Sequence, residues 1–423
     1  MPVWLADYGD YPAYDKNGRR NYLRIWGNMP GKRDAGPTWQ RRYDRFLQGL
    51  GFRKSIVDRR LFSITTDLGT MLLHIHVDDT RMTFDSPEIR KWFLEAWAAE
   101  FDEKPASTTL DSNFVGVRRA QTDPYTMELT CVGVIKSMIE LIAPFPLPPG
   151  VTCTCPMAAT TPRELREGPT EKNQLVPELA ATARRILGTI GFVTTHVRAD
   201  AYFAFCVCAG HMGEARLTRR AFAAVLRLAY YLKDTIHMPL VLHTEPSSIG
   251  TSAWGVGGII ETFVDTSHGN APDGKSYGGF VIMNKCGGGA LAWKCILQEV
   301  AVDSAGGQEL YMCTLAYKFT LAVRLLLNVL GLGETLDPTP FFTDSAIVLD
   351  GSRCERLMKA SRFGAARYAM LRFGMENGQI VALKVDSLDN VADIMTKPLT
   401  GELFFKHRAT VLGLKYRVSI DPR

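Results

Sequence analysis

The order of strand-like and helix-like segments between residues 255 and 396 constrains the fold of this chain most. Three consecutive stretches, 255–265, 275–284 and 290–296, are bounded by Gly, Asn, Asp or Ser and are typical of β-strands. The segments that follow predict, in order, a helix, a strand, a helix, a strand and a short helix, at 307–331, 338–343, 356–377, 380–385 and 390–396. In the long helix, apolar residues recur at helical spacing: Leu315, Phe319, Ala322, Leu326 and Val329. This order predicts a mixed sheet with helices packed on it.

The first hundred residues have a different pattern. Residues 37–50 carry an apolar stripe beside an Arg-rich face, which predicts an amphipathic helix ended by Gly51. Strands are expected at 61–66, 70–77 and 81–84, because apolar, β-branched runs there alternate with turn residues. Ser86 and Pro87 predict the start of a helix over 87–101.

Two stretches interrupt these patterns and mark boundaries. Residues 144–162 are rich in Pro and Thr, and residues 243–252 form a polar connector, while 174–243 read as mostly helical. We therefore expect a multidomain protein of combined α+β and α/β class. The expected segments are 1–135, 136–173, 174–250, 251–400 and 401–423.

Composition excludes several protein classes. With 46% hydrophobic and 22% charged residues, the chain is neither disordered nor fibrous. Its longest unbroken apolar run, Ala201 to Ala209, is half of the roughly 18 residues that a membrane span needs. The N-terminus lacks the basic and apolar regions of a signal peptide. An intracellular location, cytoplasmic or nuclear, is expected, with the nine cysteines as buried or free thiols.

Charge is unevenly distributed along the chain. Residues 1–60 hold thirteen Lys or Arg against six Asp, a net charge of +7, so the remainder carries −2 of the total of +5. A basic end favours contact with a polyanion such as nucleic acid, and Arg41, Arg42 and Arg45 are the candidate contacts on the first helix. A solvated surface is the alternative, and charge alone does not separate the two.

Four acids fall at the ends of elements in the last module: Asp265, Glu309, Asp344 and Asp393. Such positions can converge, and convergent carboxylates repel one another unless a cation is bound among them. Oxygen ligands suit Mg²⁺ or Mn²⁺, and two such ions can support phosphodiester hydrolysis. Spacing alone does not establish convergence, because any stretch of this length contains scattered acids.

A second pair of acids, Asp78 and Asp79, follows an apolar strand. Adjacent residues of a strand point to opposite faces, so one of the two at most points into a shared site. A polar β-turn is the simpler interpretation, since Asp is common in turns.

An ordered series of strings resembles the reverse transcriptase and RNase H of copia-type LTR retrotransposons. Residues 23–62 are similar to the family's helix and strand that precede its Tyr-Val-Asp-Asp box, where this chain has LLHIHVDD. RAFAAVLRLAYYLKDT is similar to the helix that closes the region after the polymerase. The strings similar to the C-terminal RNase H are GGFVIMNKCGGGALAWKC, DSAGGQELYM, FFTDSAIVL, ARYAMLRFGMENGQI and NVADIMTKPL. The resemblance covers about residues 20–415.

The resemblance implies a domain arrangement. Residues 1–135 correspond to a partial polymerase palm without fingers and first catalytic strand, 136–173 to a thumb-like helix and linker, and 174–250 to a helical connection. Residues 251–400 correspond to an RNase H-like mixed sheet with helices, and 401–423 to a C-terminal tail.

It also implies site residues. Asp265, Glu309, Asp344 and Asp393 match the metal-binding acids of RNase H, with Mg²⁺ as cofactor and Mn²⁺ as the alternative. Asp78 and Asp79 match two of the polymerase acids and metal ligands, and His76 replaces the box tyrosine as a nucleic-acid contact.

The expected activity is hydrolysis of the RNA strand of an RNA–DNA hybrid by a two-metal mechanism, with nucleic acid as partner. Other Pol segments are further expected partners, because they would supply the missing polymerase strand. The alternative is a catalytically inactive nucleic-acid-binding remnant. In that case the polymerase and nuclease folds persist, but neither site turns over substrate.

Overall fold

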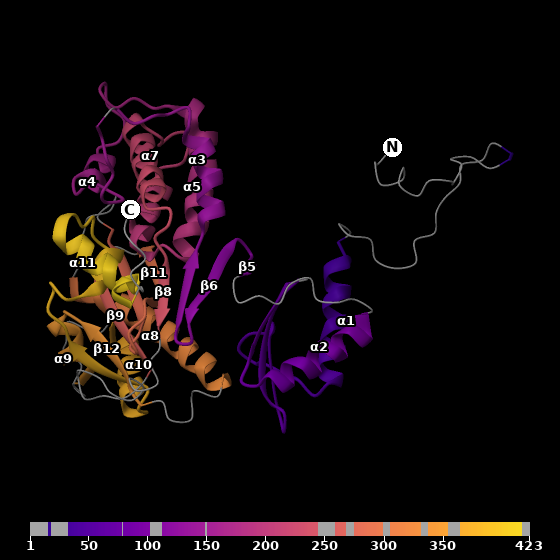
Figure 1. Ribbon diagram of the computed structural model, residues 1–423. Coiled ribbons are helices and arrows are strands. Elements are labelled where there is room, and N and C mark those ends of the chain that lie inside the picture. Colours follow the sequence, from indigo (N-terminus) through magenta and orange to yellow (C-terminus); the bar gives the residue numbers. More distant parts are fainter. Residues whose placement is uncertain are drawn as a thin grey trace. The chain divides into compact units, whose positions relative to one another are not determined.

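The computed structural model describes residues 16–17, 33–77, 79–101, 112–148, 150–243, 259–267, 275–298, 305–330, 337–353 and 364–416 (Figure 1). The chain divides into two compact units, Met1–Ala106 and Ser107–Arg423. Each is described by itself below.

Unit 1 is a four-stranded antiparallel meander packed against two helices. The strands follow one another in the sheet in chain order, and adjacent ones are joined by short connections. The elements are α1 (Ala35–Gly49), β1 (Arg53–Lys54), β2 (Leu61–Thr66), β3 (Gly69–His76), β4 (Asp79–Phe84) and α2 (Pro87–Phe101). The Ser86 hydroxyl accepts a hydrogen bond from the Ile89 amide at 3.2 Å, which confirms the expected cap of α2.

The core of unit 1 comes from alternation in the sheet and from one face of each helix. Met71, Leu73 and Ile75 of β3 are fully buried, as strand periodicity requires. Tyr43 and Leu47 of α1 are buried against them, while Arg41, Arg42 and Arg45 lie exposed on the other face. The amphipathic helix expected from the sequence is therefore confirmed.

The second unit begins with a small antiparallel sheet and a group of helices. The sheet order is β5-β6-β7-β8, so β8 returns to this sheet after more than a hundred residues. Its strands are β5 (Ser112–Phe114), β6 (Val117–Asp123), β7 (Thr126–Thr130) and β8 (Leu240–His243). The helices between them are α3 (Val132–Ile142), α4 (Thr161–Arg166), α5 (Ala180–His196), α6 (Tyr202–Ala209) and α7 (Arg219–Asp234), with 3₁₀ turns η2 (Pro177–Leu179) and η3 (Ala199–Ala201). Helices α3, α5 and α7 lie side by side (Figure 1).

The rest of unit 2 is the expected mixed sheet with helices. Its strand order is β11-β10-β9-β12-β13, antiparallel from β11 to β9 and parallel from β9 to β13. The strands are β9 (Ile260–Thr266), β10 (Tyr277–Asn284), β11 (Ala290–Leu297), β12 (Thr339–Thr343) and β13 (Ile380–Lys384). The helices are α8 (Ala305–Val329), α9 (Ala346–Arg353), α10 (Ala365–Glu376) and α11 (Gly401–Val411), with 3₁₀ turns η7 (Val391–Met395) and η8 (Leu414–Tyr416).

The two faces of this sheet are covered by different parts of unit 2. Phe280 and Ile282 of β10 pack toward α8 and α10. Val281 and Met283, which point to the opposite face, share a core with the helices α5 to α7 and α11. Every residue of β10 is consequently buried. The helical part and the mixed sheet are thus joined by one continuous apolar core.

Helix α8 is long and apolar enough, by length and composition, to span a membrane. In this fold 44% of its most apolar 18-residue window is buried, and its side chains pack on β9 and β10. Core helices of folded proteins share these properties, so the length of α8 is weak evidence for a membrane span.

The structure corrects one expected element and adds another. The third strand is expected at 81–84, but β4 begins at Asp79, which pairs with His76. Helix α9 lies in a stretch where no element is expected from the sequence. Of the helix expected over 356–377, residues 365–376 form α10, and residues 356–363 lie outside the described residues.

Candidate active site

The mixed sheet brings three of the four predicted RNase H acids to one edge. Strands β9 and β12 run parallel with Val264 opposite Thr343, so Asp265, the next residue of β9, and Asp344, the residue after β12, lie side by side. Asp393 belongs to η7, which lies against β9 and β10. Asp265 and Asp393 are only 3% and 4% exposed.

Helix α8 supplies the fourth acid. Glu309 lies in its first turns, and its electrostatic interactions with Asp265 and Asp344 show that the carboxylates are neighbours. One Glu309 oxygen, Oε2, is buried without a hydrogen-bond partner. The four acids are therefore near enough for their charges to influence one another.

Two residues fix η7 against the sheet. The Asn390 side chain donates to the Val264 carbonyl at 3.0 Å and accepts from the Ala392 amide at 3.2 Å, so it caps η7 and ties it to β9. Gly279 pairs with Asp265, and a Cβ at Gly279 would come within 2.4 Å of the Met395 Cβ. Only glycine permits this close approach of β10 and η7.

A lysine lies between two of the acids. Lys397 Nζ is 2.7 Å from Asp393 Oδ1 and 3.4 Å from Asp265 Oδ1. The other oxygen of Asp265 accepts a hydrogen bond from the Thr396 hydroxyl. Asp344 is held differently, because its Oδ2 accepts from the Ser387 hydroxyl at 3.1 Å.

The electrostatics of the cluster reflect burial and mutual repulsion. The pKa of Asp265 is raised, and the pKa values of Glu309 and Asp393 are raised to about 7. Burial is the largest cause in all three, neighbouring carboxylates add to the rise, and Lys397 opposes it. Burial lowers the pKa of Lys397, but its carboxylate partners outweigh this and the net shift is upward.

The donor set fits a hard divalent cation. It consists of carboxylate oxygens, and the unpartnered Glu309 Oε2 is an available ligand atom. Across the described ranges, however, no three His, Cys, Asp or Glu side chains form a ready-made metal site. In this arrangement the Lys397 ammonium lies between Asp265 and Asp393.

The predicted polymerase residues lie in unit 1, on the hairpin of β3 and β4. His76 and Asp79 are exposed and face each other across the two strands, and Asp78 lies outside the described residues. Val77, in the turn, has φ of 57°, which is unusual for a β-branched residue. Its carbonyl accepts a hydrogen bond from Trp39 Nε1 at 2.7 Å, which ties the turn to α1.

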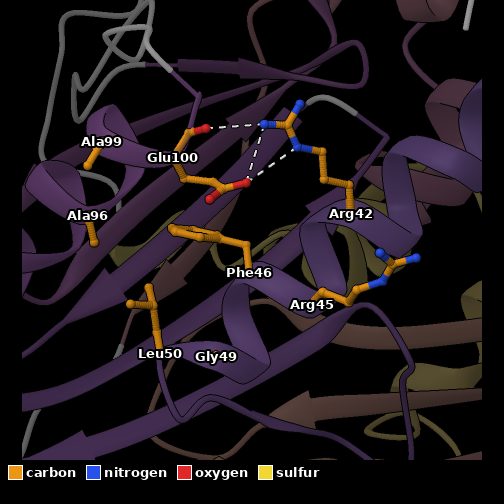
Figure 2. Close-up of a pocket in the computed structure, with 8 residues that line it drawn as sticks. All are labelled: Arg42, Arg45, Phe46, Gly49, Leu50, Ala96, Ala99 and Glu100. Atoms are coloured by element: carbon orange, nitrogen blue, oxygen red, sulfur yellow. Dashed lines mark hydrogen bonds and ion pairs between the residues drawn. The ribbon is translucent and has the colours of Figure 1, made fainter. Parts of the chain in front are cut away.

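The predicted nucleic-acid contacts on α1 are exposed but differ in their surroundings. Arg42 forms an ion pair with Glu100 of α2 at 3.3 Å and lies over the Phe101 ring. Arg42 and Arg45 line an open groove of about 690 Å³ between α1 and α2 (Figure 2). The other lining residues are Phe46, Gly49, Leu50, Ala96, Ala99 and Glu100. Arg42 is thus partly neutralised within the chain, whereas the Arg45 guanidinium points away from Glu100 (Figure 2).

Sequence reasoning missed Lys397, Thr396 and Asn390, although all three lie in the string NVADIMTKPL. The spacing of Lys397 four residues after Asp393 is the available signal, because residues four apart in a helical turn are neighbours. It also missed a buried ion pair, in which Arg198 contacts Asp200 at 2.8 Å, with both side chains at most 1% exposed.

Comparisons with known proteins place the likeness at the level of fold. No family model and no curated protein matches the chain. Among solved structures, the chain is similar to RNase H1 of the archaeon Halobacterium salinarum, with 13% identity over 32% of this chain and 93% of that one, at a TM-score of 0.25. LC11-RNase H1 in complex with an RNA/DNA hybrid has 15% identity over 32% of this chain and 93% of that chain, at a TM-score of 0.25.

A longer likeness is to the foamy viral protease-reverse transcriptase in complex with double-stranded DNA. It covers 84% of this chain at 11% identity and a TM-score of 0.42, and the match spans 49% of the viral chain. RNases H and protease-reverse transcriptases are thus among the solved structures to which this chain is similar. The mixed α+β class expected from the sequence is confirmed.

Proposed function

We propose that unit 2 hydrolyses the RNA strand of RNA–DNA hybrids, and that the chain is a reverse transcriptase and RNase H segment of a copia-type retrotransposon polyprotein. The observation that supports the activity is the position of Asp265, Asp344 and Asp393 at one end of the mixed sheet, with Glu309 of α8 near enough for its charge to interact with Asp265 and Asp344. The copia origin is supported by the ordered sequence strings. Similar solved structures hold an RNA/DNA hybrid or double-stranded DNA, which supports a nucleic-acid partner.

In this proposal the four carboxylates hold Mg²⁺ or Mn²⁺. When bound, two such ions would supply an activated water and stabilise the leaving oxygen. Glu309 offers its unpartnered Oε2 to a ribose 2′-hydroxyl, the group that distinguishes RNA from DNA. Asn390 and Thr396 keep Asp393 and Asp265 in place through their hydrogen bonds.

The decisive experiment incubates the purified chain with a labelled RNA–DNA hybrid and Mg²⁺. Asp265→Asn is expected to reduce cleavage by about a hundredfold or more, because a ligand carboxylate is lost. Asp389→Asn is the matched control, since Asp389 is 64% exposed and pairs with Lys406 outside the cluster. Cleavage that survives Asp265→Asn, or no cleavage with either Mg²⁺ or Mn²⁺, would reject the proposal.

A second candidate function is nucleic-acid binding without turnover. The observation that favours it is the position of Lys397, which neutralises two of the acids without any metal. It predicts salt-dependent retention of the hybrid that Arg41, Arg42 and Arg45 substitutions weaken and Asp265→Asn leaves unchanged. Asp79 is exposed at the start of β4, and the polymerase reaction is not part of the proposal.

A further inference from the structure

Lys397 has two properties that seldom occur together at an acid cluster. Its ammonium is close to Asp393 Oδ1 and Asp265 Oδ1, at 2.7 Å and 3.4 Å, and so takes the place of a cation between them. Its side chain is nevertheless 35% exposed, whereas those of its two partners are at most 6% exposed. The lysine therefore has a path to solvent that the carboxylates lack.

The backbone beneath Lys397 is fixed. Its amide donates to the Asp393 carbonyl at 2.9 Å. Pro398 and Leu399, with Met157 and Phe203 of the helical part, line a cavity of only about 10 Å³. A long, flexible side chain on a fixed backbone can withdraw without disturbing the fold.

Resting on the proposed function, we propose that Lys397 is a built-in competitor for the divalent cation. In the metal-free protein, Lys397 neutralises the charges of Asp265 and Asp393. Binding of the cation then displaces the Lys397 ammonium toward solvent. The lysine thereby weakens the affinity of the site for the metal and keeps the carboxylates paired when the metal is absent. A positive charge this close to two ligands opposes a second cation strongly, because the cluster is shielded from water.

The test measures metal binding on the full chain and uses no nuclease assay. Isothermal titration with MnCl₂, and separately with MgCl₂, is performed at constant ionic strength on wild type, Lys397→Met and Lys397→Arg. Removing the charge is expected to tighten the Mn²⁺ dissociation constant by about tenfold or more. The arginine variant keeps the charge and is expected to stay within about threefold of wild type.

Lys406→Met is the matched control, because Lys406 pairs with Asp389 and lies outside the cluster. An affinity of Lys397→Met equal to or weaker than that of wild type overturns the inference, as does an equal gain in Lys406→Met. Should Lys397→Met fail to fold, Lys397→Gln replaces it with the same expectation.

The outcome is separable from that of the proposed function. Tighter metal binding in Lys397→Met without any hybrid cleavage would reject the nuclease and retain the competitor. Cleavage that depends on Asp265, with unchanged metal affinity in Lys397→Met, would retain the proposed nuclease activity and reject the role of Lys397 as a competitor for the cation.

Discussion

Two groups of buried charges in unit 2 differ in how their charges are balanced. Arg198 and Asp200 form a closed pair, because Asp200 also accepts from the Tyr231 hydroxyl and Arg198 donates to the Thr235 carbonyl. Such pairs are costly to break and have no remaining capacity for a ligand. The cluster around Lys397 is open, since this one lysine forms ion pairs with Asp265 and Asp393 and also interacts with the charge of Asp344. The excess of carboxylates over lysine makes the cluster around Lys397 a candidate site, whereas the balanced pair of Arg198 and Asp200 is structural.

His407 of α11 makes the stability of unit 2 depend on pH. Its pKa is lowered from 6.5 to about 4, mainly by burial, with Lys406 contributing to the decrease and Asp389 opposing it. The unfolded chain therefore takes up a proton as pH falls through 6.5, whereas the folded chain does so only near 4. The contribution of His407 to the free energy of unfolding is fully present above pH 6.5 and is lost as the pH falls toward 4.

Urea denaturation should show that wild type loses about 1 to 2 kcal/mol more than His407→Leu between pH 7.5 and 5. The same substitution at the exposed His237 should leave the wild-type pH profile unchanged, and an equal effect there would contradict the assignment.

At the scale of elements, the site depends on three contacts that η7 makes with the sheet. Asn390 ties η7 to β9, and Gly279 lets β10 approach η7 closely. Lys397 links Asp393 of η7 to Asp265 of β9. The turn is short and carries only a few hydrogen bonds of its own, so its position is set by these neighbours. A substitution in β10 should therefore shift the position of Asp393 even though no acid is replaced.

Gly279→Ala tests this dependence. The added methyl would lie 2.4 Å from Met395 Cβ, so η7 must move away from β10. We expect a loss of about 1 to 3 kcal/mol in the free energy of unfolding by urea denaturation, as for other overpacked cores, together with weaker Mn²⁺ binding. Gly188→Ala in α5 is the control, because a Cβ there meets nothing within 4 Å. Unchanged stability and metal affinity in Gly279→Ala would show that η7 is held by other contacts.

At the scale of the whole molecule, the mixed sheet from β11 to β13 is one part of a larger unit. Its outer face shares a core with α5, α6 and α7, and two further contacts join the two parts. Trp293 Nε1 donates to the Thr194 carbonyl at 2.9 Å, and the Val241 amide donates to the Leu412 carbonyl at 2.8 Å. Removing the helical part would expose the apolar side chains of β10 and β11 that face it.

A protease site inserted between residues 250 and 251 tests the continuity of this core. After cleavage we expect both fragments to elute together on size-exclusion chromatography, because the core between them is apolar and extensive. The fragment 251–423 produced alone is expected to aggregate or to unfold at least about 10 °C below the full chain. A soluble, monomeric 251–423 with the melting temperature of the full chain would show instead an independent domain.

Local pattern was enough to predict most elements and the identity of the four acids. The bounds of α2 agree with the predicted 87–101, because its capping Ser86 and its periodicity are local properties. Helix α8 was predicted as a helix, but its most buried face is not the stripe through Leu315 and Phe319. That face carries Leu310, Cys313, Ala316, Tyr317 and Thr320, while Phe319 is 40% exposed. A helix that is apolar on several sides offers more than one such stripe, and the sheet against which it packs selects between them.

Near neighbours along the chain thus determined where helices and strands form, since capping, turns and periodicity act over a few residues. Only the tertiary structure decided what those elements meet. It placed Lys397 between two acids, enclosed Arg198 with Asp200, and covered the second face of the sheet with helices that precede it in the chain. Each of these involves residues far apart in sequence, such as Lys397 with Asp265 and Arg198 with Thr235, whose approach is set by packing of the whole unit.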